Sequence, residues 1–356
     1  MRVRQLTSTA PHHLWFPGPQ ATLLSVLLCL GGALSRPGQA AETNTFTNPV
    51  VETGADPWVV SRDGQYYLCQ SRRGTGVWVG RSAQLHRLGQ ASWARVWDPP
   101  KGAAYSREIW APELHWLRGR WYVYVAADDG DNANHRMYVL EGDTGDPQLP
   151  FRFIGKIADP ADRWAIDGTV LAFDDGRLYF IWSGWEGTEN VSQNLYLAPM
   201  SNPWTISGAR VCISRPEHDW EKHGRPLINE GPQVLRHQDR LFIIYSASGS
   251  WGDDYCLGQL AWTGGDPLKP ESWVKKPTPV FSRTKDVFGP GHCSFVKSPD
   301  GREDWIVYHA AKRSGSGWDR NIRLQRFGWL PDGSPDFGTP VSPGVPLAWP
   351  SGDTQP

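Results

Sequence analysis

The sequence predicts an all-β fold, a five-bladed β-propeller with a central cavity. Short aromatic and β-branched segments recur five times, and their starts at Gln65, Arg120, Arg177, Arg240 and Asp304 are 55, 57, 63 and 64 residues apart. No long amphipathic helix pattern competes with them. A period of about sixty residues, with about four strands in each unit, is typical of a propeller whose blades surround a channel. A stacked solenoid or a two-sheet sandwich is the alternative, but neither explains why every unit begins with polar residues.

Two strands of each unit can be read directly from the residue pattern. Each repeated segment follows turn residues such as Asp63-Gly64 or Arg118-Gly119, which is the signature of a β-hairpin. The predicted second strands are residues 65–69, 120–124, 177–182, 240–245 and 304–308. A third strand follows each of them, at residues 77–79, 136–139, 194–197, 257–260 and 322–325. We assign residues 46–345 to one propeller domain.

The first strand of each unit opens with a polar motif. The five motifs are Ala55-Asp56-Pro57-Trp58, Ala111-Pro112-Glu113-Leu114-His115, Ile166-Asp167-Gly168-Thr169, Asn229-Glu230-Gly231-Pro232 and Gly291-His292-Cys293-Ser294. In a propeller the first strand of each blade lines the channel, so residues at its start face a shared cavity rather than a dry core. We therefore expect the five motifs to converge.

Residues 1–40 have the composition of a secretory leader. Arg2 and Arg4 precede a mostly apolar run over residues 21–34, and small residues flank Gln39 at the end of the segment. We predict a signal peptide at residues 1–40, cleaved near Ala40, and a secreted or periplasmic protein with no membrane attachment after cleavage. A retained N-terminal anchor is the alternative. Residues 346–356 are assigned to a C-terminal tail.

Charge and cysteine content narrow the classes of partner. The chain has 36 Lys and Arg against 37 Asp and Glu, a formal net charge of −1, which gives no electrostatic reason to expect nucleic acid or an anionic membrane. Four cysteines follow the leader, Cys69, Cys212, Cys256 and Cys293. They could pair in three ways in an oxidising compartment, and no CxxC spacing indicates zinc.

Three of the polar motifs carry a carboxylate directly before Pro or Gly, namely Asp56, Asp167 and Glu230. A single acid at such a position is usually a cap or a turn residue, but three at the same point of three repeats converge in a ring. Carboxylates that share a low-dielectric cavity cannot all ionise easily, so at least one keeps its proton to higher pH. Glycoside hydrolysis needs this arrangement, with one acid protonated and another ionised.

Aromatic residues near the motifs favour a sugar partner. Trp58, Trp110 and Trp185 are candidates for substrate contact, because indole faces stack well on sugar rings. Trp110 is next to the second motif, and Trp185 follows the second strand of the third unit. Most of the 20 tryptophans are expected to pack between blades instead.

The motifs together resemble family 43 of the glycoside hydrolases, five-bladed propeller enzymes that remove arabinofuranosyl or xylosyl units with inversion. The resemblance covers residues 48–341 and depends on five motifs in order, Asp56-Pro57-Trp58, Trp110-Ala111-Pro112-Glu113, Ile166-Asp167-Gly168-Thr169, Glu230-Gly231-Pro232 and Gly289-Pro290-Gly291-His292. It implies that Asp56 is the general base and Glu230 the general acid, with Asp167 raising the pKa of that acid and orienting it. Inversion would require the carboxyls of Asp56 and Glu230 to lie roughly 6.5–9.5 Å apart.

The resemblance also implies roles for three further residues. His292 would face the channel and help to hold a calcium ion through water, with a hydrogen-bonded structural histidine as the alternative. Arg323 would contact the substrate, unless it forms an ion pair at the rim. Glu113 would have a structural or substrate-lining role. No cofactor is required for the chemistry, and calcium would be structural.

The function that the resemblance implies is a secreted, inverting exo-glycosidase, an α-L-arabinofuranosidase acting on arabinan or other arabinose-containing oligosaccharides and polysaccharides. Within the family, a β-xylosidase or an endo-arabinanase is the alternative, and loop conformation decides between exo and endo action. From a different class, a propeller lectin would keep the aromatic residues without needing three convergent carboxylates. A protein-scaffold propeller lacks support, because no Trp-Asp or kelch-like repeat is present. We expect a monomer.

Overall fold

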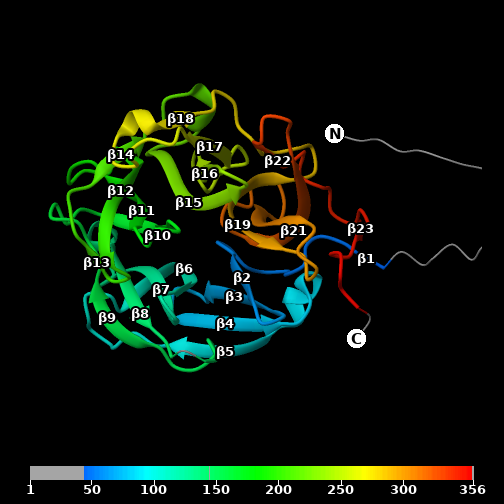
Figure 1. The fold of residues 1–356 in the computed structure, drawn as a ribbon, viewed down its shortest axis with the longest axis horizontal. Coiled ribbons are helices and arrows are strands. Elements are labelled where there is room, and N and C mark those ends of the chain that lie inside the picture. Colours follow the sequence, from blue (N-terminus) through cyan, green and yellow to red (C-terminus); the bar gives the residue numbers. More distant parts are fainter. Residues whose placement is uncertain (1–43, 144, 355–356) are drawn as a thin grey trace, which may run out of the picture. The chain divides into compact units, whose positions relative to one another are not determined.

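The described residues form five sheet units arranged as blades around one centre. The computed structural model describes residues 44–143 and 145–354. Figure 1 shows the units following one another around the ring in sequence order, with β2, β6, β10, β15 and β19 nearest the centre. The predicted fold class is confirmed.

The strands of each blade follow the chain from the centre outward and pair antiparallel. The first blade comprises β2 (Trp58–Arg62), β3 (Gln65–Ser71), β4 (Val77–Ser82) and β5 (Ser92–Trp97). The second comprises β6 (Arg107–Leu117), β7 (Arg120–Asp128), β8 (Arg136–Glu141) and β9 (Arg152–Lys156). The third comprises β10 (Ala165–Ala172), β11 (Leu178–Trp185) and β12 (Ser192–Asn202), with β13 (Thr205–Ile206) and β14 (Val211–Ser214) both beside β12.

The fourth blade comprises β15 (Leu227–His237), β16 (Arg240–Ala247), β17 (Cys256–Trp262) and β18 (Trp273–Lys275). The fifth comprises β19 (Phe288–Lys297), β20 (Asp304–Ala311), β21 (Arg320–Trp329) and β22 (Pro335–Asp336). The helical segments in the described ranges are short 3₁₀ turns, η1 (Leu85–Gln90), η2 (Asn132–Asn134), η3 (Asp219–Glu221) and η4 (Pro270–Ser272). All the predicted second and third strands are therefore present, each somewhat longer than its pattern.

The core lies between neighbouring blades. Because the second strand of a blade is covered on both faces, its residues are apolar at nearly every position; Trp121 to Val125 on β7, for example, are at most 3% exposed. Tyr124 on β7 packs against Phe180 on β11 of the next blade, with ring centroids 5.4 Å apart. Such aromatic pairs each bury a large area, which holds adjacent blades at a fixed angle.

Ring closure uses the residues just before the first blade. The side chain of Asn48 exchanges two hydrogen bonds with the backbone of Leu324 on β21, at 2.8 and 2.9 Å. The backbone N–H of Val50 donates to the carbonyl of Ile322, and that of Gly54 donates to the carbonyl of Arg320. The segment that leads to Asp56 is therefore bound to the last blade before the chain enters the first.

Residues 346–354, predicted as a C-terminal tail, lie in the same compact unit as the propeller. β23 (Leu347–Ala348) pairs antiparallel with β1 (Thr45–Phe46). Farther along, Oδ2 of Asp353 lies 2.9 Å from Nδ1 of His86, and both side chains are buried. A two-residue strand and one long-range pair leave no periodic pattern in the sequence.

The predicted signal peptide, residues 1–40, lies outside the described residues. Within the described ranges, no helix is long and apolar enough to cross a membrane. The four cysteines Cys69, Cys212, Cys256 and Cys293 are free thiols, so none of the three pairings occurs in this structure.

The second to fifth polar motifs lie at irregularities inside the inner strands, whereas Asp56 of the first motif lies just before β2. The pairing register shifts between Trp110 and Glu113, between Ile166 and Thr169, between Glu230 and Gln233, and beside His292. Left-handed backbone marks these positions, with φ of 47° at Asp56, 40° at Ala111, 54° at Asp167, 55° at Gly231 and 42° at His292. Strands therefore begin earlier than the motifs suggested. A bulge redirects a side chain out of the pleat, which is why such irregularities occur beside active sites.

Candidate functional site

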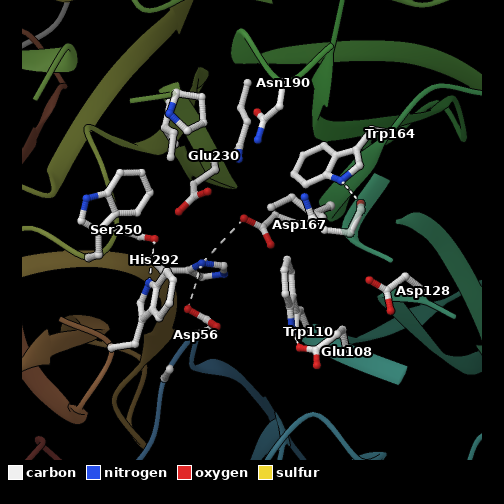
Figure 2. Close-up of a pocket in the computed structure, with 18 of the residues that line it drawn as sticks. Asp56, Glu108, Trp110, Asp128, Trp164, Asp167, Asn190, Glu230, Ser250 and His292 are labelled. Atoms are coloured by element: carbon white, nitrogen blue, oxygen red, sulfur yellow. Dashed lines mark hydrogen bonds and ion pairs between the residues drawn. The ribbon is translucent and has the colours of Figure 1, made fainter. Parts of the chain in front are cut away.

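A cavity of about 720 Å³ lies where the five inner strands meet. The first, third, fourth and fifth motifs contribute Asp56, Asp167, Glu230 and His292 to its lining, and the second contributes the neighbouring Trp110. Figure 2 shows the three carboxyl groups directed into this space, with the imidazole of His292 between Asp56 and Asp167. The predicted convergence of the motifs is thus present in the structure.

The carboxylate of Asp56 is surrounded by nitrogen atoms of three side chains. The backbone N–H of Asp56 donates to Nδ1 of His309 at 3.0 Å. Its Oδ1 lies 3.1 Å from the same Nδ1, 3.3 Å from Nδ1 of His292 and 3.4 Å from a guanidinium nitrogen of Arg320. The left-handed backbone and these contacts together fix the direction of the carboxylate.

These neighbours keep Asp56 ionised. Burial alone would raise its pKa, but the attraction of the cationic forms of His292 and His309 and of Arg320, together with the side-chain contact with His309, holds the pKa well below its usual range. Burial also lowers the pKa of His292 and takes that of His309 to about 3, so both rings are neutral at pH 7. At that pH Arg320 supplies the positive charge.

Asp167 and Glu230 face the cavity from adjacent blades. Oδ2 of Asp167 accepts a hydrogen bond from the backbone N–H of Gly231 at 3.0 Å, next to Glu230 in the chain. The same oxygen lies 3.9 Å from Nδ1 of His292. Oε1 of Glu230 accepts a hydrogen bond from the hydroxyl of the buried Tyr255 at 2.9 Å.

Both of these carboxyls resist ionisation. Burial raises the pKa of Glu230 to about 7; the charge of Asp56 adds to the effect, and the hydrogen bond from Tyr255 and the charge of Arg320 oppose it. Burial also raises the pKa of Asp167 well above its usual value, and the charges of Glu230 and Asp56 add to that shift. Near neutral pH a proton is therefore retained on this side of the cavity.

Two aromatic side chains form one wall. Trp110 stacks on the buried His135, with ring centroids 4.0 Å apart, and its indole N–H donates to Glu108. Trp164 lines the cavity as well and stacks face to face on Trp185, whose centroid is 4.9 Å away. Trp185 is thus behind the wall rather than part of it.

Trp58 does not line the cavity. Its indole N–H donates to the carbonyl of Leu114, and its ring packs 4.4 Å from that of His115. Contact between Trp58 and a ligand in this cavity, which the sequence suggested, is therefore not what the geometry favours. The side chain supports the junction between the first two blades.

Arg323 and Glu113 are also outside the lining. Arg323 is 1% exposed and donates to the side-chain oxygen of Asn321. Arg320, three residues earlier on the same strand, lines the cavity instead. Glu113 is 2% exposed and bonds to His115 and Gln233, which matches the structural alternative.

A directly bound metal ion does not fit the side chains around His292. Among the described residues, no group of three or more His, Cys, Asp or Glu side chains is arranged to hold a metal. Calcium takes six to eight oxygen ligands, whereas Nδ1 of His292 faces the carboxylate of Asp56. Calcium held through water stays a prediction.

Several lining residues were missed by the sequence analysis. They are Glu108, Asp128, Asn132, Trp164, Asn190, Gln193, Ser250, Trp318 and Arg320. Most belong to connections between strands or to strand ends, which the repeat does not align. Only Glu108 had a usable signal, because it precedes the second motif by three residues.

Comparison with known proteins supports one family. The model of "Glycosyl hydrolases family 43" matches residues 46–335. A Streptomyces avermitilis protein named extracellular exo-α-(1→5)-L-arabinofuranosidase is 37% identical over 90% of this chain and 68% of its own length. A Streptomyces chartreusis protein of the same name is 35% identical over 82% of this chain and 92% of its own. The crystal structure of an α-L-arabinofuranosidase from Lactobacillus brevis is 35% identical, covers 84% of this chain and 98% of its own, and superposes with a TM-score of 0.79.

Proposed function

Because the chain belongs to family 43 of the glycosyl hydrolases, we propose that it releases terminal α-L-arabinofuranosyl residues from arabinan and other arabinose-containing oligosaccharides and polysaccharides. We further propose that it acts outside the cell, as the names of two relatives state for those proteins. The observation that carries the catalytic part is the contrast between Asp56 and Glu230. In the same cavity, neighbouring charges hold the pKa of Asp56 well below its usual range, whereas burial raises the pKa of Glu230 to about 7.

In this proposal Asp56 is the general base and Glu230 the general acid. Asp56 takes a proton from a water molecule as the water oxygen bonds to the anomeric carbon of the terminal sugar. Glu230 gives its proton to the glycosidic oxygen as the bond between that oxygen and the anomeric carbon breaks. Arabinose of inverted anomeric configuration and a shortened saccharide leave, and the two carboxyls return to their starting states through solvent.

Asp167 is proposed to orient the acid and to keep it protonated. Its hydrogen bond to the N–H of Gly231 fixes the backbone next to Glu230. Its negative charge, whenever present, disfavours a second charge on Glu230, because the two carboxyls interact across a buried space. Trp110 and Arg320 are proposed to contact the sugar, since both line the cavity.

The substrate assignment is tested by product analysis. Linear arabinan, arabinoxylan and aryl glycosides of arabinose and xylose are each incubated with the enzyme, and products are separated by size. Monomeric arabinose alone from linear arabinan is the expected result. Oligosaccharide products would instead identify an endo-arabinanase, and xylose release from the aryl xyloside with no arabinose release would identify a β-xylosidase.

The stereochemical part has a separate test. Proton NMR of the first product from an aryl α-L-arabinofuranoside should show the β-anomer before mutarotation. Appearance of the α-anomer would mean retention and would exclude Asp56 as a base acting on water. A lectin, the alternative from another class, would show no turnover of any of these substrates.

A further inference from the structure

Two further hollows adjoin the catalytic cavity on the side of the first blade. One, of about 480 Å³, shares Ala55, Trp318 and Arg320 with the catalytic cavity. Another, of about 610 Å³, shares Glu108 with the catalytic cavity and Arg73 with the first hollow. A polysaccharide whose end occupies the catalytic cavity can therefore continue over Trp318 or Glu108 into these hollows without leaving the surface.

The two hollows carry cations that have no acidic partner. Arg72, Arg73, Lys101 and Arg107 line them together with Asp98, Glu108 and Asp319, and none of the four cations forms an ion pair with a described carboxylate. Two exposed arginines that flank the fourth blade behave differently.

Arg215 there is paired with Glu186 at 2.8 Å, and Arg283 with Asp254 at 3.0 Å. Acidic and basic residues are nearly equal in number over the whole chain, so the net charge does not indicate that four cations without an ion pair line these two hollows.

Arg72 is held in place by two indole rings. Its guanidinium carbon lies 4.0 Å from the ring centroid of Trp93 and 4.9 Å from that of Trp78. Stacking of this kind fixes the plane of the guanidinium and leaves its N–H donors free at the edge. A planar donor group held in advance and lacking an acid is suited to a carboxylate, which it can bind through two parallel hydrogen bonds.

We propose that these two hollows bind the carboxylates of a uronate-bearing polysaccharide while its neutral arabinose-containing branch enters the catalytic cavity. A neutral arabinan chain has no negative charge to pair with Arg72 and Arg73, whereas an acidic backbone does. The inference rests on the proposed arabinofuranosidase function for the identity of the branch, but not for the binding of the carboxylates.

Binding is tested with polygalacturonate, a linear uronate polymer without arabinose. Affinity gel electrophoresis at low salt should show retardation of the wild type, and added salt should weaken it. The double variant R72Q/R73Q should bind about tenfold more weakly. The control R302Q/K285Q removes the same charge from two exposed side chains outside both hollows and should bind like the wild type.

Three outcomes would overturn the proposal. They are no retardation of the wild type, equal loss in both double variants, and equal retardation by dextran sulfate, which would indicate attraction to any polyanion. Retardation that R72Q/R73Q alone removes supports the proposal even if the enzyme releases no arabinose, and in that case only the proposed function fails.

Kinetics connect the two sites. The substrate is an arabinan still attached to its uronate backbone, compared with the same material after its carboxyls have been reduced to alcohols. The wild type should have a KM about tenfold lower for the acidic form, and R72Q/R73Q should abolish that preference. The kcat/KM of R72Q/R73Q on a neutral arabino-oligosaccharide should equal that of the wild type, which would also show that the variant folds. An unchanged preference in R72Q/R73Q would contradict the proposal.

Discussion

Asp56 and Glu230 lie on opposite sides of one cavity, each beside left-handed backbone at the inner end of a blade, yet their surroundings differ in kind. Asp56 faces two imidazoles and a guanidinium. Glu230 has one hydroxyl partner, that of Tyr255. Burial raises the pKa of both, and only around Asp56 do nearby charges overcome it.

The repeat therefore places both carboxyls in the cavity, whereas the side chains around each carboxyl determine whether it is ionised. A symmetric scaffold would make the two carboxyls equivalent. The asymmetry comes from the last blade, because His292, His309 and Arg320 all belong to β19, β20 and β21. Ring closure brings this blade next to Asp56, so the fold itself determines which acid is ionised.

Replacing each of the two carboxyls in turn should cause the largest loss of activity. Both D56N and E230Q should lower kcat on arabino-oligosaccharides by about 10³-fold, within the range for general acid–base groups. With a 2,4-dinitrophenyl arabinoside, whose leaving group needs no proton, E230Q should recover most of its rate and D56N should not. Recovery in both variants, or in D56N alone, would reverse or remove the proposed roles.

The sequence predicted the scaffold and the carboxyls better than it predicted the substrate-contacting residues. Asp56, Asp167 and Glu230 could be found because a repeat aligns them, and one cavity then follows from the ring. Trp164 and Arg320 could not, since each lies outside the five motifs. Trp185 and Arg323 looked suitable by type and proximity, but Trp164 stacks over Trp185 and Arg323 is buried against Asn321.

The two carboxyls should also have opposite effects on stability. E230Q removes a group whose folded pKa is raised, so the free energy of unfolding should rise by on the order of 2 kcal/mol above pH 7, and this gain should vanish below about pH 4.5. D56N removes a group whose folded pKa is depressed, so stability should fall by on the order of 2 kcal/mol wherever the unfolded chain would be ionised.

Urea unfolding of both variants at pH 4, 6 and 8 measures the difference. The gap between E230Q and the wild type should grow between pH 4 and pH 8, because the wild-type Glu230 ionises near pH 4.5 in the unfolded chain but only near pH 7 in the folded protein, where its pKa is raised. A constant gap would mean that the pKa of Glu230 is not raised, and Asp56 and Glu230 would then not differ in the way proposed.

The pH dependence of turnover should change when Asp167 loses its charge. In the wild type, kcat/KM should fall as pH rises through about 7, where Glu230 loses the proton it must donate. Because the pKa of Asp167 is itself raised, its charge can act on Glu230 only in the pH range where Asp167 is ionised. D167N removes that charge, so the alkaline limb should move to lower pH by up to about one unit. An alkaline limb that stays in place would leave Asp167 with an orienting role only.

Removing the hydroxyl of Tyr255 should have the smallest and most selective effect, because this hydroxyl donates a hydrogen bond to Glu230 and none to Asp56. The hydrogen bond favours the ionised form of Glu230 and so lowers its pKa against the effect of burial. Y255F should therefore move the alkaline limb upward, by roughly half a unit to one unit for a single hydrogen bond to a charged group.

The ring of Tyr255 stacks on that of His309, with centroids 5.6 Å apart, and phenylalanine keeps this contact beside Asp56. The acidic limb should consequently be unchanged in Y255F, and kcat below pH 6 should fall only a few-fold as the acid loses one positioning contact. A shift of both limbs would mean that the two carboxyls communicate through the stacked rings. A downward shift of the alkaline limb would show that the hydroxyl stabilises the protonated acid, and the physical basis for the contrast between Asp56 and Glu230 would have to be sought in burial alone.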